Sequence, residues 1–220
     1  MVQVSTHETT AEPARRSQAA RRSESDGRMM SAAAKLIARH GVAGTTLAQV
    51  GIEAGYSRGL PVERYGSKLG LIHALLAATE HWFEQHLERI LAGKQGMAAL
   101  ERRIEAHMGS VDRSKDATAA LYAIYTESHS VMPELKRAVA AFTARWSAGL
   151  AAHMREGQAS GEIAKDLDCD AEARFLLAAM RGLMIQYLMD RSARDLMRAK
   201  KILLAHCRDR LALPKARRAR

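Results

Sequence analysis

The sequence predicts an all-α protein, in which an N-terminal three-helix domain of helix-turn-helix type is joined by a long helix to a C-terminal helical bundle. Three observations predict this class. Helix-forming residues dominate, and only four prolines occur in 220 residues. Apolar residues recur at the spacing of amphipathic helices, and no segment alternates with the period of a strand. Glycine, serine and threonine stand where the helices should begin and end.

Composition divides the chain into four parts. Residues 1–26 are rich in Ser, Thr, Ala, Glu and Arg without apolar periodicity, which predicts a disordered arm. Residues 27–70 hold the short helices of the first domain, and residues 71–213 hold the longer helices of the second. Residues 214–220 carry four basic side chains and no acid, which predicts a basic tail.

Capping signals place the helices of the first domain. They are expected at about 28–40, 47–54, 58–65 and, as the long connecting helix, 67–92. Thr46, followed three residues later by Gln49, matches the capping-box pattern at the start of the second helix. Gly55 stands in the tight turn before the third helix, where positive φ is needed, and Ser57 is its expected N-cap.

The second domain reads as further helices with weaker boundaries. They are expected near 97–112, 116–128, 133–156, 170–190 and 194–212. Pro133 suits the first position of a helix, because its missing N–H has no partner there. Ser192 with Asp195 starts the last helix with a capping-box pattern.

The charge balance narrows the class of partner. A formal net charge of +10 indicates an anionic partner, which nucleic acid and a membrane surface both satisfy, although a solvated basic surface is an alternative. No apolar run approaches the roughly 20 residues of a membrane span, and no signal-peptide core is present. Cys169 and Cys207 lie far apart in no CxxC pattern, which favours a reducing compartment. We therefore expect a cytoplasmic protein that does not enter membranes.

The two short helices around Gly55 have the helix-turn-helix layout, in which the second helix enters the major groove of DNA. Residues 29–71 resemble the DNA-binding domain of the TetR family of regulators. The matching residues are Ala32-Ala33, Gly41, Thr45-Thr46, Ala54-Gly55-Tyr56-Ser57, Tyr65 and Ser67-Lys68. Their spacing agrees with the family pattern without an insertion or a deletion.

The resemblance implies a transcriptional regulator, usually a repressor, that binds a palindromic double-stranded DNA operator and leaves it when a small-molecule ligand binds. It also implies that residues 71–213 form a ligand-sensing domain, which holds a homodimer together mainly through the last two helices.

Two positions depart from the family pattern. Pro61-Val62 stand where the family usually has a Tyr that meets the DNA backbone. As the fourth residue of a helix from 58, Pro61 would remove the hydrogen bond to the Ser57 carbonyl, so the helix is expected to tilt or to begin later. Gly51 replaces the usual Ala of the second helix.

The expected DNA contacts follow from side-chain chemistry. Arg58 can donate two hydrogen bonds to guanine or bind a phosphate, and Lys68 places an ammonium group at a helix start suited to a phosphate. For Tyr65, packing within the small domain and contact with DNA are both open. The full predicted set is Thr45, Thr46, Ser57, Arg58, Gly59, Leu60, Glu63, Arg64, Tyr65, Ser67 and Lys68.

An apolar stripe on the last two helices predicts the dimer interface, with burial inside one subunit as the alternative. Ala178 and Gly182 form a small-xxx-small pair that would let another helix come close. The predicted interface residues are Phe175, Leu176, Ala178, Ala179, Gly182, Leu183, Tyr187, Leu196, Leu203 and Cys207.

Aromatic and methionine side chains of the middle helices could line a cavity for a small apolar or amphipathic ligand, although for each one taken alone a place in the core is the favoured alternative. The predicted lining is Trp82, Phe83, Met108, Tyr122, Tyr125, Phe142, Trp146 and Met184. The histidines show no metal-ligand spacing, and no catalytic or cofactor motif appears. We therefore expect no metal, no cofactor and no enzyme, and keep a non-specific basic module and a helical carrier or enzyme as alternatives.

Overall fold

The computed structural model describes residues 18–212, apart from the side chains of residues 112 and 113. The elements are α1 (Gln18–His40), α2 (Leu47–Glu53), α3 (Leu60–Tyr65), α4 (Lys68–Leu91), α5 (Gly96–Met108), α6 (Ser110–Arg113), α7 (Lys115–Ser130), the 3₁₀ helix η1 (Pro133–Leu135), α8 (Lys136–Ala159), α9 (Cys169–Asp190) and α10 (Ala193–Leu211). Between residues 18 and 212 there is no β-strand, only an isolated bridge between Ile163 and Ala212. The predicted all-α class is confirmed.

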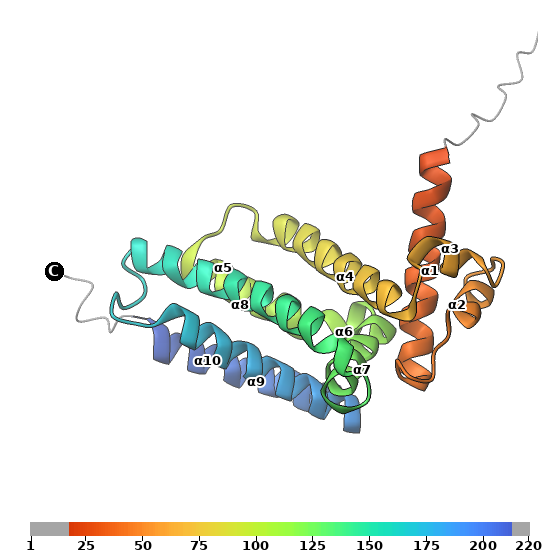
Figure 1. The fold of residues 1–220 in the computed structure, drawn as a ribbon. Coiled ribbons are helices and arrows are strands. Elements are labelled where there is room, and N and C mark those ends of the chain that lie inside the picture. The colour runs from red at the N-terminus through yellow and green to blue at the C-terminus, as the bar shows by residue number, and fades with distance from the viewer. Residues whose placement is uncertain (1–17, 213–220) are drawn as a thin grey trace, which may run out of the picture.

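Helices α1, α2 and α3 form a small domain at one end of the molecule, and α4 connects it to an elongated bundle (Figure 1). The small domain has its own buried core, made mainly by Met29, Ala33, Leu36, Val50 and Leu71. The residues from α1 recur at helical spacing, and burying them against α2 and the start of α4 provides the main stabilisation of the short helices α2 and α3. The predicted arrangement of two domains around a long helix is therefore observed.

The first helix begins ten residues earlier than predicted. Helix α1 starts at Gln18 instead of about Arg28, so residues 18–26 of the predicted disordered arm are helical. This extension is almost entirely exposed, with Ser25 as its buried exception, and an exposed helical segment has no apolar face to reveal it in sequence. Residues 1–17 and the predicted tail, 214–220, lie outside the described residues.

The bundle is held by a continuous core between α5, α7, α8 and α9, in which Ile104, Ile124, Phe142 and Met184 are fully buried. Helix α8 packs along both α5 and α9, and α10 covers α9 and α5 at the outer face. In the part of the chain that the structure describes, no helix is long and apolar enough to cross a membrane.

Candidate nucleic-acid interface and ligand cavity

The start of α2 is capped as predicted. Thr46 Oγ1 accepts a hydrogen bond from the Gln49 amide at 3.2 Å, and Gln49 Oε1 accepts one from the Thr46 amide at 2.8 Å. Gly55, at φ +80°, then makes the turn after α2, where the Tyr56 amide donates to the Gly51 carbonyl at 2.8 Å. The turn therefore has the geometry that places α3 across α2.

Helix α3 begins at Leu60, two residues after the expected position 58, and this is the later start that was one of the two outcomes expected from Pro61. Its N-cap is Gly59 and not Ser57. The later start places Pro61 in the first turn, where its missing N–H has no intrahelical partner to lose. Pro61 is buried against Gly51: a Cβ on Gly51 would lie 3.1 Å from Pro61 Cδ and 2.4 Å from the Ser57 carbonyl oxygen. The two departures from the family pattern are therefore neighbours in space, and the glycine makes room for the turn and the proline.

Six of the predicted DNA contacts are exposed around α2, α3 and the start of α4: Thr46, Ser57, Arg58, Gly59, Glu63 and Ser67. Arg58 forms no ion pair with any described residue, so its guanidinium group is available to an external anion. Leu60 is partly buried and packs against the core of the small domain. The predicted contact residues thus divide into an exposed group and a group engaged within the protein.

Four more predicted contact residues join Leu60 in the second group. The prediction for Thr45 is wrong, because this residue is 2% exposed and its hydroxyl donates to the Gly41 carbonyl at 2.8 Å. Arg64 forms an ion pair with Asp26 of α1 at 2.6 Å, and the Tyr65 hydroxyl donates to the same carboxylate at 3.2 Å. Burial, with Asp26 nearby, raises the pKa of Tyr65 to about 12. The packing alternative for Tyr65 is the one observed.

The fourth of these, Lys68, helps to hold the loop after α1. Its Nζ donates to the carbonyls of Val42 and Ala43, at 3.0 and 2.9 Å. From the opposite side, the Glu127 carboxylate of α7 accepts hydrogen bonds from the amides of the same two residues, at 2.7 and 2.8 Å. Gly41, at φ +72°, lets the chain pass, because a Cβ there would lie 2.6 Å from Glu127 Oε1. This loop therefore fastens α7 of the bundle to the small domain.

A hollow of about 460 Å³ lies between α3 and the N-terminal extension of α1, residues 18–27, which was not predicted to be helical. Arg21 and Arg22 of the extension line it together with Arg64 and Glu63 of α3. The two extension arginines are exposed. Sequence reasoning missed them as candidate contacts because the extension was assigned to a disordered arm.

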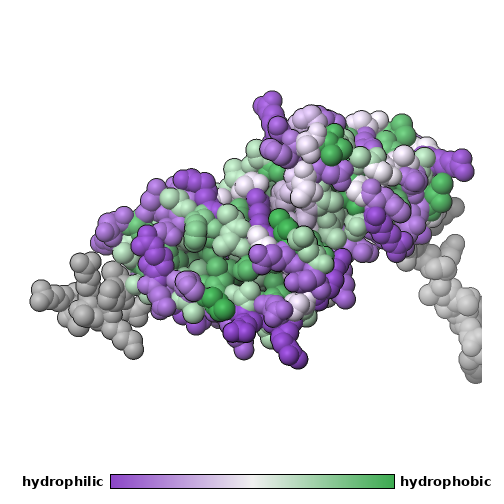
Figure 2. Space-filling view, turned by 90° about the horizontal axis from the view of Figure 1, so that it is seen from below, coloured by the Kyte–Doolittle hydropathy of each residue, from purple (hydrophilic) through white to green (hydrophobic). Residues whose placement is uncertain are grey.

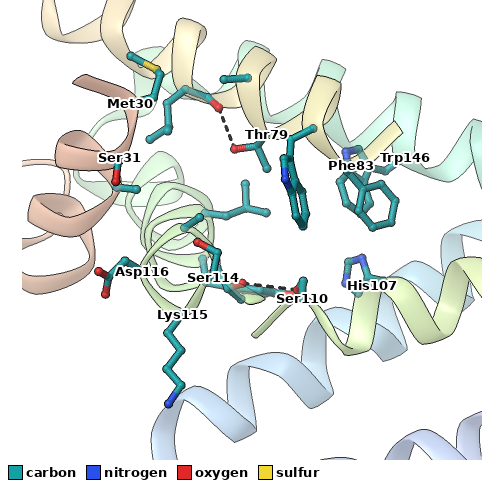
Figure 3. Close-up of a pocket in the computed structure, with 18 residues that line it drawn as sticks. Met30, Ser31, Thr79, Phe83, His107, Ser110, Ser114, Lys115, Asp116 and Trp146 are labelled. Atoms are coloured by element: carbon teal, nitrogen blue, oxygen red, sulfur yellow. Dashed lines mark hydrogen bonds between the residues drawn. The ribbon is translucent and has the colours of Figure 1, made fainter. Parts of the chain in front are cut away.

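The bundle contains a cavity of about 600 Å³ where it meets the small domain (Figure 3). Of the predicted lining residues, Trp82, Phe83, Tyr122 and Trp146 line this cavity. The other four do not: Met108, Phe142 and Met184 are buried core residues, and Tyr125 is engaged with Arg181. Helical periodicity identifies inward-facing residues, but it cannot separate those that face a cavity from those that face other side chains.

Several lining residues were not predicted, and they come from elements on both sides of the domain boundary. Met30, Ser31 and Ala34 belong to α1, whereas Thr79 belongs to α4. His107, at the end of α5, lies edge-on to the Trp146 ring with centroids 5.2 Å apart. Burial, together with the nearby charges of Arg181 and Arg103, lowers the pKa of His107 to about 3, so the ring is neutral at pH 7.

Helix α9 exposes an apolar stripe that differs in part from the predicted interface. Phe175 is 73% exposed, and Ala178 and Gly182 continue its line, followed by the unpredicted Ile185 and by Met189, which is 82% exposed. Their alternating spacing of three and four residues places them on one face of the helix. Seen from below the view of Figure 1, hydrophobic residues gather over this side of the bundle between hydrophilic borders (Figure 2).

The remaining predicted interface residues point elsewhere. Leu176, Tyr187 and Cys207 are buried within the subunit, which corrects their assignment, and Ala179, Leu183, Leu196 and Leu203 are partly buried. On α10, the exposed apolar side chains are instead Met197 and Ile202. The exposed stripe differs from the predicted interface because the buried face and the exposed face of α9 both carry apolar residues at helical spacing. The sequence pattern therefore could not show which face is buried.

Two family models match the chain. Residues 29–75 match the model described as bacterial regulatory proteins of the tetR family, and residues 97–212 match that of the C-terminal domain of BetI-type transcriptional repressors. A search of curated protein sequences finds no relative with significant similarity.

Solved structures share the fold. A Rhodococcus sp. protein described as a TetR-family transcriptional regulator is 23% identical, with a TM-score of 0.75 over 83% of this chain and 96% of its own. A TetR transcriptional regulator from Chloroflexus aurantiacus is 22% identical, with a TM-score of 0.74 over 87% and 98% of the two chains. The regulator FadR from Bacillus subtilis, in complex with stearoyl-CoA, is 17% identical, with a TM-score of 0.73 over 82% and 96%.

Proposed function

Because the chain belongs to the TetR family and is a DNA-binding transcriptional regulator, we propose that it is a homodimeric repressor, released from a palindromic operator when a small molecule fills the cavity between α1, α4 and α7. It acts in the cytoplasm by binding and not by catalysis. The stearoyl-CoA bound to B. subtilis FadR supports a ligand in this fold.

The observation that carries the proposal is the position of the cavity. Its wall includes Met30 and Ser31 of α1 as well as Thr118 and Tyr122 of α7, so a ligand touches the small domain and the bundle at once. Helix α7 also holds the loop after α1 through Glu127. A ligand that prefers one spacing of α1 and α7 therefore shifts the orientation of the small domain, and with it the position of α3.

The exposed stripe on α9 supports the proposed dimer. Phe175 and Met189 would bury large apolar areas against a second copy, and Ala178 and Gly182 between them allow close approach of two helices. A twofold axis through this face presents two recognition helices, so each subunit reads one half of a palindrome.

Each half-site is contacted by the exposed group around α3. Arg58 precedes the helix and reads a guanine edge or binds a phosphate, whereas the hydroxyls bind phosphates. Lys68 uses two of its three donors on the loop after α1, which leaves the third for a phosphate. The proposed contacts are Thr46, Ser57, Arg58, Gly59, Glu63, Ser67 and Lys68.

Selection of bound duplexes from a random pool tests the proposal. We expect a palindromic consensus, bound by a particle with twice the mass of the chain in light scattering. Enrichment of no sequence would favour the non-specific basic module instead. A single half-site bound by one chain would contradict the dimer.

A further inference from the structure

One side of the cavity wall is a row of hydroxyl residues from α6 and the start of α7. Ser110, Ser114 and Thr118 all line the cavity. Two backbone hydrogen bonds of 3.0 Å, from the Ser114 amide to the Ser110 carbonyl and from the Thr118 amide to the Ser114 carbonyl, keep the three in register. The hydroxyls of Ser110 and Thr118 are 3.5 Å apart. A hydroxyl can donate and accept, so this row suits a neutral oxygen of either kind.

The other end of the cavity is aromatic. The rings of Phe83 of α4 and Trp146 of α8 are stacked with centroids 4.3 Å apart, and both side chains are largely buried. Leu75 and Leu121 add aliphatic surface to the wall. Figure 3 shows the two rings together at one end, away from Ser114. This end therefore suits an aromatic ring of a ligand, which gains from apolar contact and from stacking.

The wall offers no counter-charge to an ion inside the cavity. Among its described residues, Lys115 and Asp116 carry charges of opposite sign, and both are exposed. They lie at the edge of the cavity away from the Phe83 and Trp146 rings (Figure 3). His107, which also lines the cavity, is buried and neutral at pH 7. A ligand between the rings and the hydroxyl row therefore meets neutral groups only.

Two arginines act on His107 but do not line the cavity. Arg103 is paired with Glu84 at 3.0 Å. Arg181 donates to the Tyr125 hydroxyl at 2.8 Å, and its guanidinium lies 4.3 Å from the centre of that ring. A cation in the cavity would be repelled by these charges, and an anion would find neither guanidinium in the wall to contact. Either ion would give up its hydration without a direct partner.

We propose that the cavity takes an uncharged, amphipathic aromatic ligand, whose ring lies against Phe83 and Trp146 and whose hydroxyl or carbonyl oxygen forms hydrogen bonds with the row of Ser110, Ser114 and Thr118. This inference rests on the proposed ligand-sensing function, and it names the chemical class of that ligand. Because the polar end of such a ligand is held by α6 and α7, its binding affects the helix that is joined to the loop after α1.

A series of probes with one biphenyl body tests the charge. The probes are biphenyl-4-methanol, biphenyl-4-carboxylate and 4-phenylbenzylammonium. The two tryptophans of the chain, Trp82 and Trp146, both line the cavity, so a change of intrinsic fluorescence reports binding without DNA. We expect the alcohol to bind roughly tenfold or more tightly than either ion, because each ion is desolvated without a counter-charge. Equal or tighter binding of the carboxylate or the ammonium compound would overturn the proposal.

Substitutions in the hydroxyl row test the polar end. Ser114 makes no side-chain cap at the start of α7, so Ser114→Ala removes a hydroxyl without removing a capping bond. Combined with Thr118→Val, it should weaken the alcohol roughly threefold or more. Binding of 4-methylbiphenyl, which has no oxygen, should stay unchanged or become tighter. Ser130→Ala, at an exposed serine of α7 outside the cavity, is the matched control and should change neither affinity.

Equal weakening of the alcohol and of 4-methylbiphenyl in the double variant would contradict the proposed hydrogen bonds. The charge series needs only the native protein, so it decides the ligand class even if the double variant does not fold. Release of operator DNA is measured separately. A preference for the alcohol without release would leave the ligand class standing and contradict the proposed function, whereas release by a charged probe that binds more tightly than the alcohol would do the reverse.

Discussion

The carboxylate of Glu127 accepts a hydrogen bond of 2.7 Å from the backbone amide of Val42, and this contact joins two parts of the chain 85 residues apart. Lys68 holds the same loop from the other side by donating to the Val42 carbonyl. The loop after α1 is thus fixed by a side chain from α7 and by one from α4, the two helices that line opposite sides of the cavity. Any shift of α7 is transmitted to the end of α1.

We therefore predict that Glu127→Gln loosens this joint. One oxygen acceptor and the negative charge are lost, so hydrogen exchange at the Val42 and Ala43 amides should accelerate, by roughly tenfold, because a hydrogen bond to a charged group is worth about 1.5 to 3 kcal/mol. Glu134→Gln, at an exposed glutamate of η1, is the matched control and should leave these amides unchanged. Unaltered exchange in Glu127→Gln would show that the carboxylate does not hold the loop.

A second prediction distinguishes the roles of Gly51 and Gly59 in the helix-turn-helix. Gly51→Ala places a Cβ 2.4 Å from the Ser57 carbonyl oxygen and should destabilise the small domain by about 1 to 3 kcal/mol, as overpacking does. Gly59 has nothing within 4 Å of an added Cβ and a φ of −84° that alanine adopts readily. Gly59→Ala should therefore keep or raise the melting temperature.

The two variants should also differ in how they lose DNA binding. If the backbone at Gly59 approaches DNA closely, Gly59→Ala loses operator affinity while its thermal stability is retained. Gly51→Ala loses affinity and stability together. Operator titrations beside thermal denaturation check this, and full affinity in Gly59→Ala would remove Gly59 from the interface.

The same region shows what sequence could and could not predict. Thr46 was predictable, because a capping box is a local pattern of two side chains. The start of α3 was predictable only in part: Pro61 indicated a tilt or a later start, but the N-cap at Gly59 instead of Ser57 depends on how Gly51 of α2 and Pro61 of α3 pack. The exposed extension of α1 was missed for a third reason, since it buries too little to leave an apolar pattern.

For the cavity, sequence predicted the residue types but not their places. Trp82 and Phe142 carry the same signal, an aromatic residue on a helix of the bundle, yet Trp82 lines the cavity and Phe142 is fully buried in the core. Thr45 and Thr46 are adjacent and chemically identical, but one is buried and one is exposed. Such differences are set by tertiary packing, which local periodicity does not contain.

His107 predicts a pH dependence of stability. Its pKa is lowered to about 3 in the folded protein from 6.5, so between these values the unfolded chain binds more protons and stability falls as the pH falls. Between pH 7 and pH 5 the native protein should lose about 2 kcal/mol of unfolding free energy relative to His107→Leu, which cannot titrate there. Urea denaturation of both proteins at the two pH values measures this difference, and parallel losses would place the charged ring in a favourable environment.

The exposed stripe of α9 predicts the effect of charge on assembly. Phe175→Glu should convert the proposed dimer to monomers in sedimentation experiments, because a charge facing its symmetry mate cannot be buried without a partner. Val131→Lys, at another exposed apolar site, at the end of α7, should remain dimeric. A dimeric Phe175→Glu protein would assign the interface to another face.

The extension of α1 predicts a wider DNA contact than α3 alone. Arg21 and Arg22 are exposed beside the hollow that the extension shares with Arg64 of α3, so we expect both to reach phosphates that flank the groove proposed for α3. Replacing both by Ala removes four positive charges from the proposed dimer. The slope of log affinity against log salt should then become shallower by about 2 to 4, with the selected consensus unchanged.

The control variant removes the same number of positive charges, but at a site away from the proposed DNA contacts. Lys136 and Arg137 are exposed at the start of α8, in the bundle, and their double replacement by Ala should leave the slope within about 1 of the native value. Equal slopes for the two double variants would mean that the N-terminal extension of α1 does not contact DNA. A changed consensus would instead mean that the arginines contact bases, because phosphate contacts carry no sequence information.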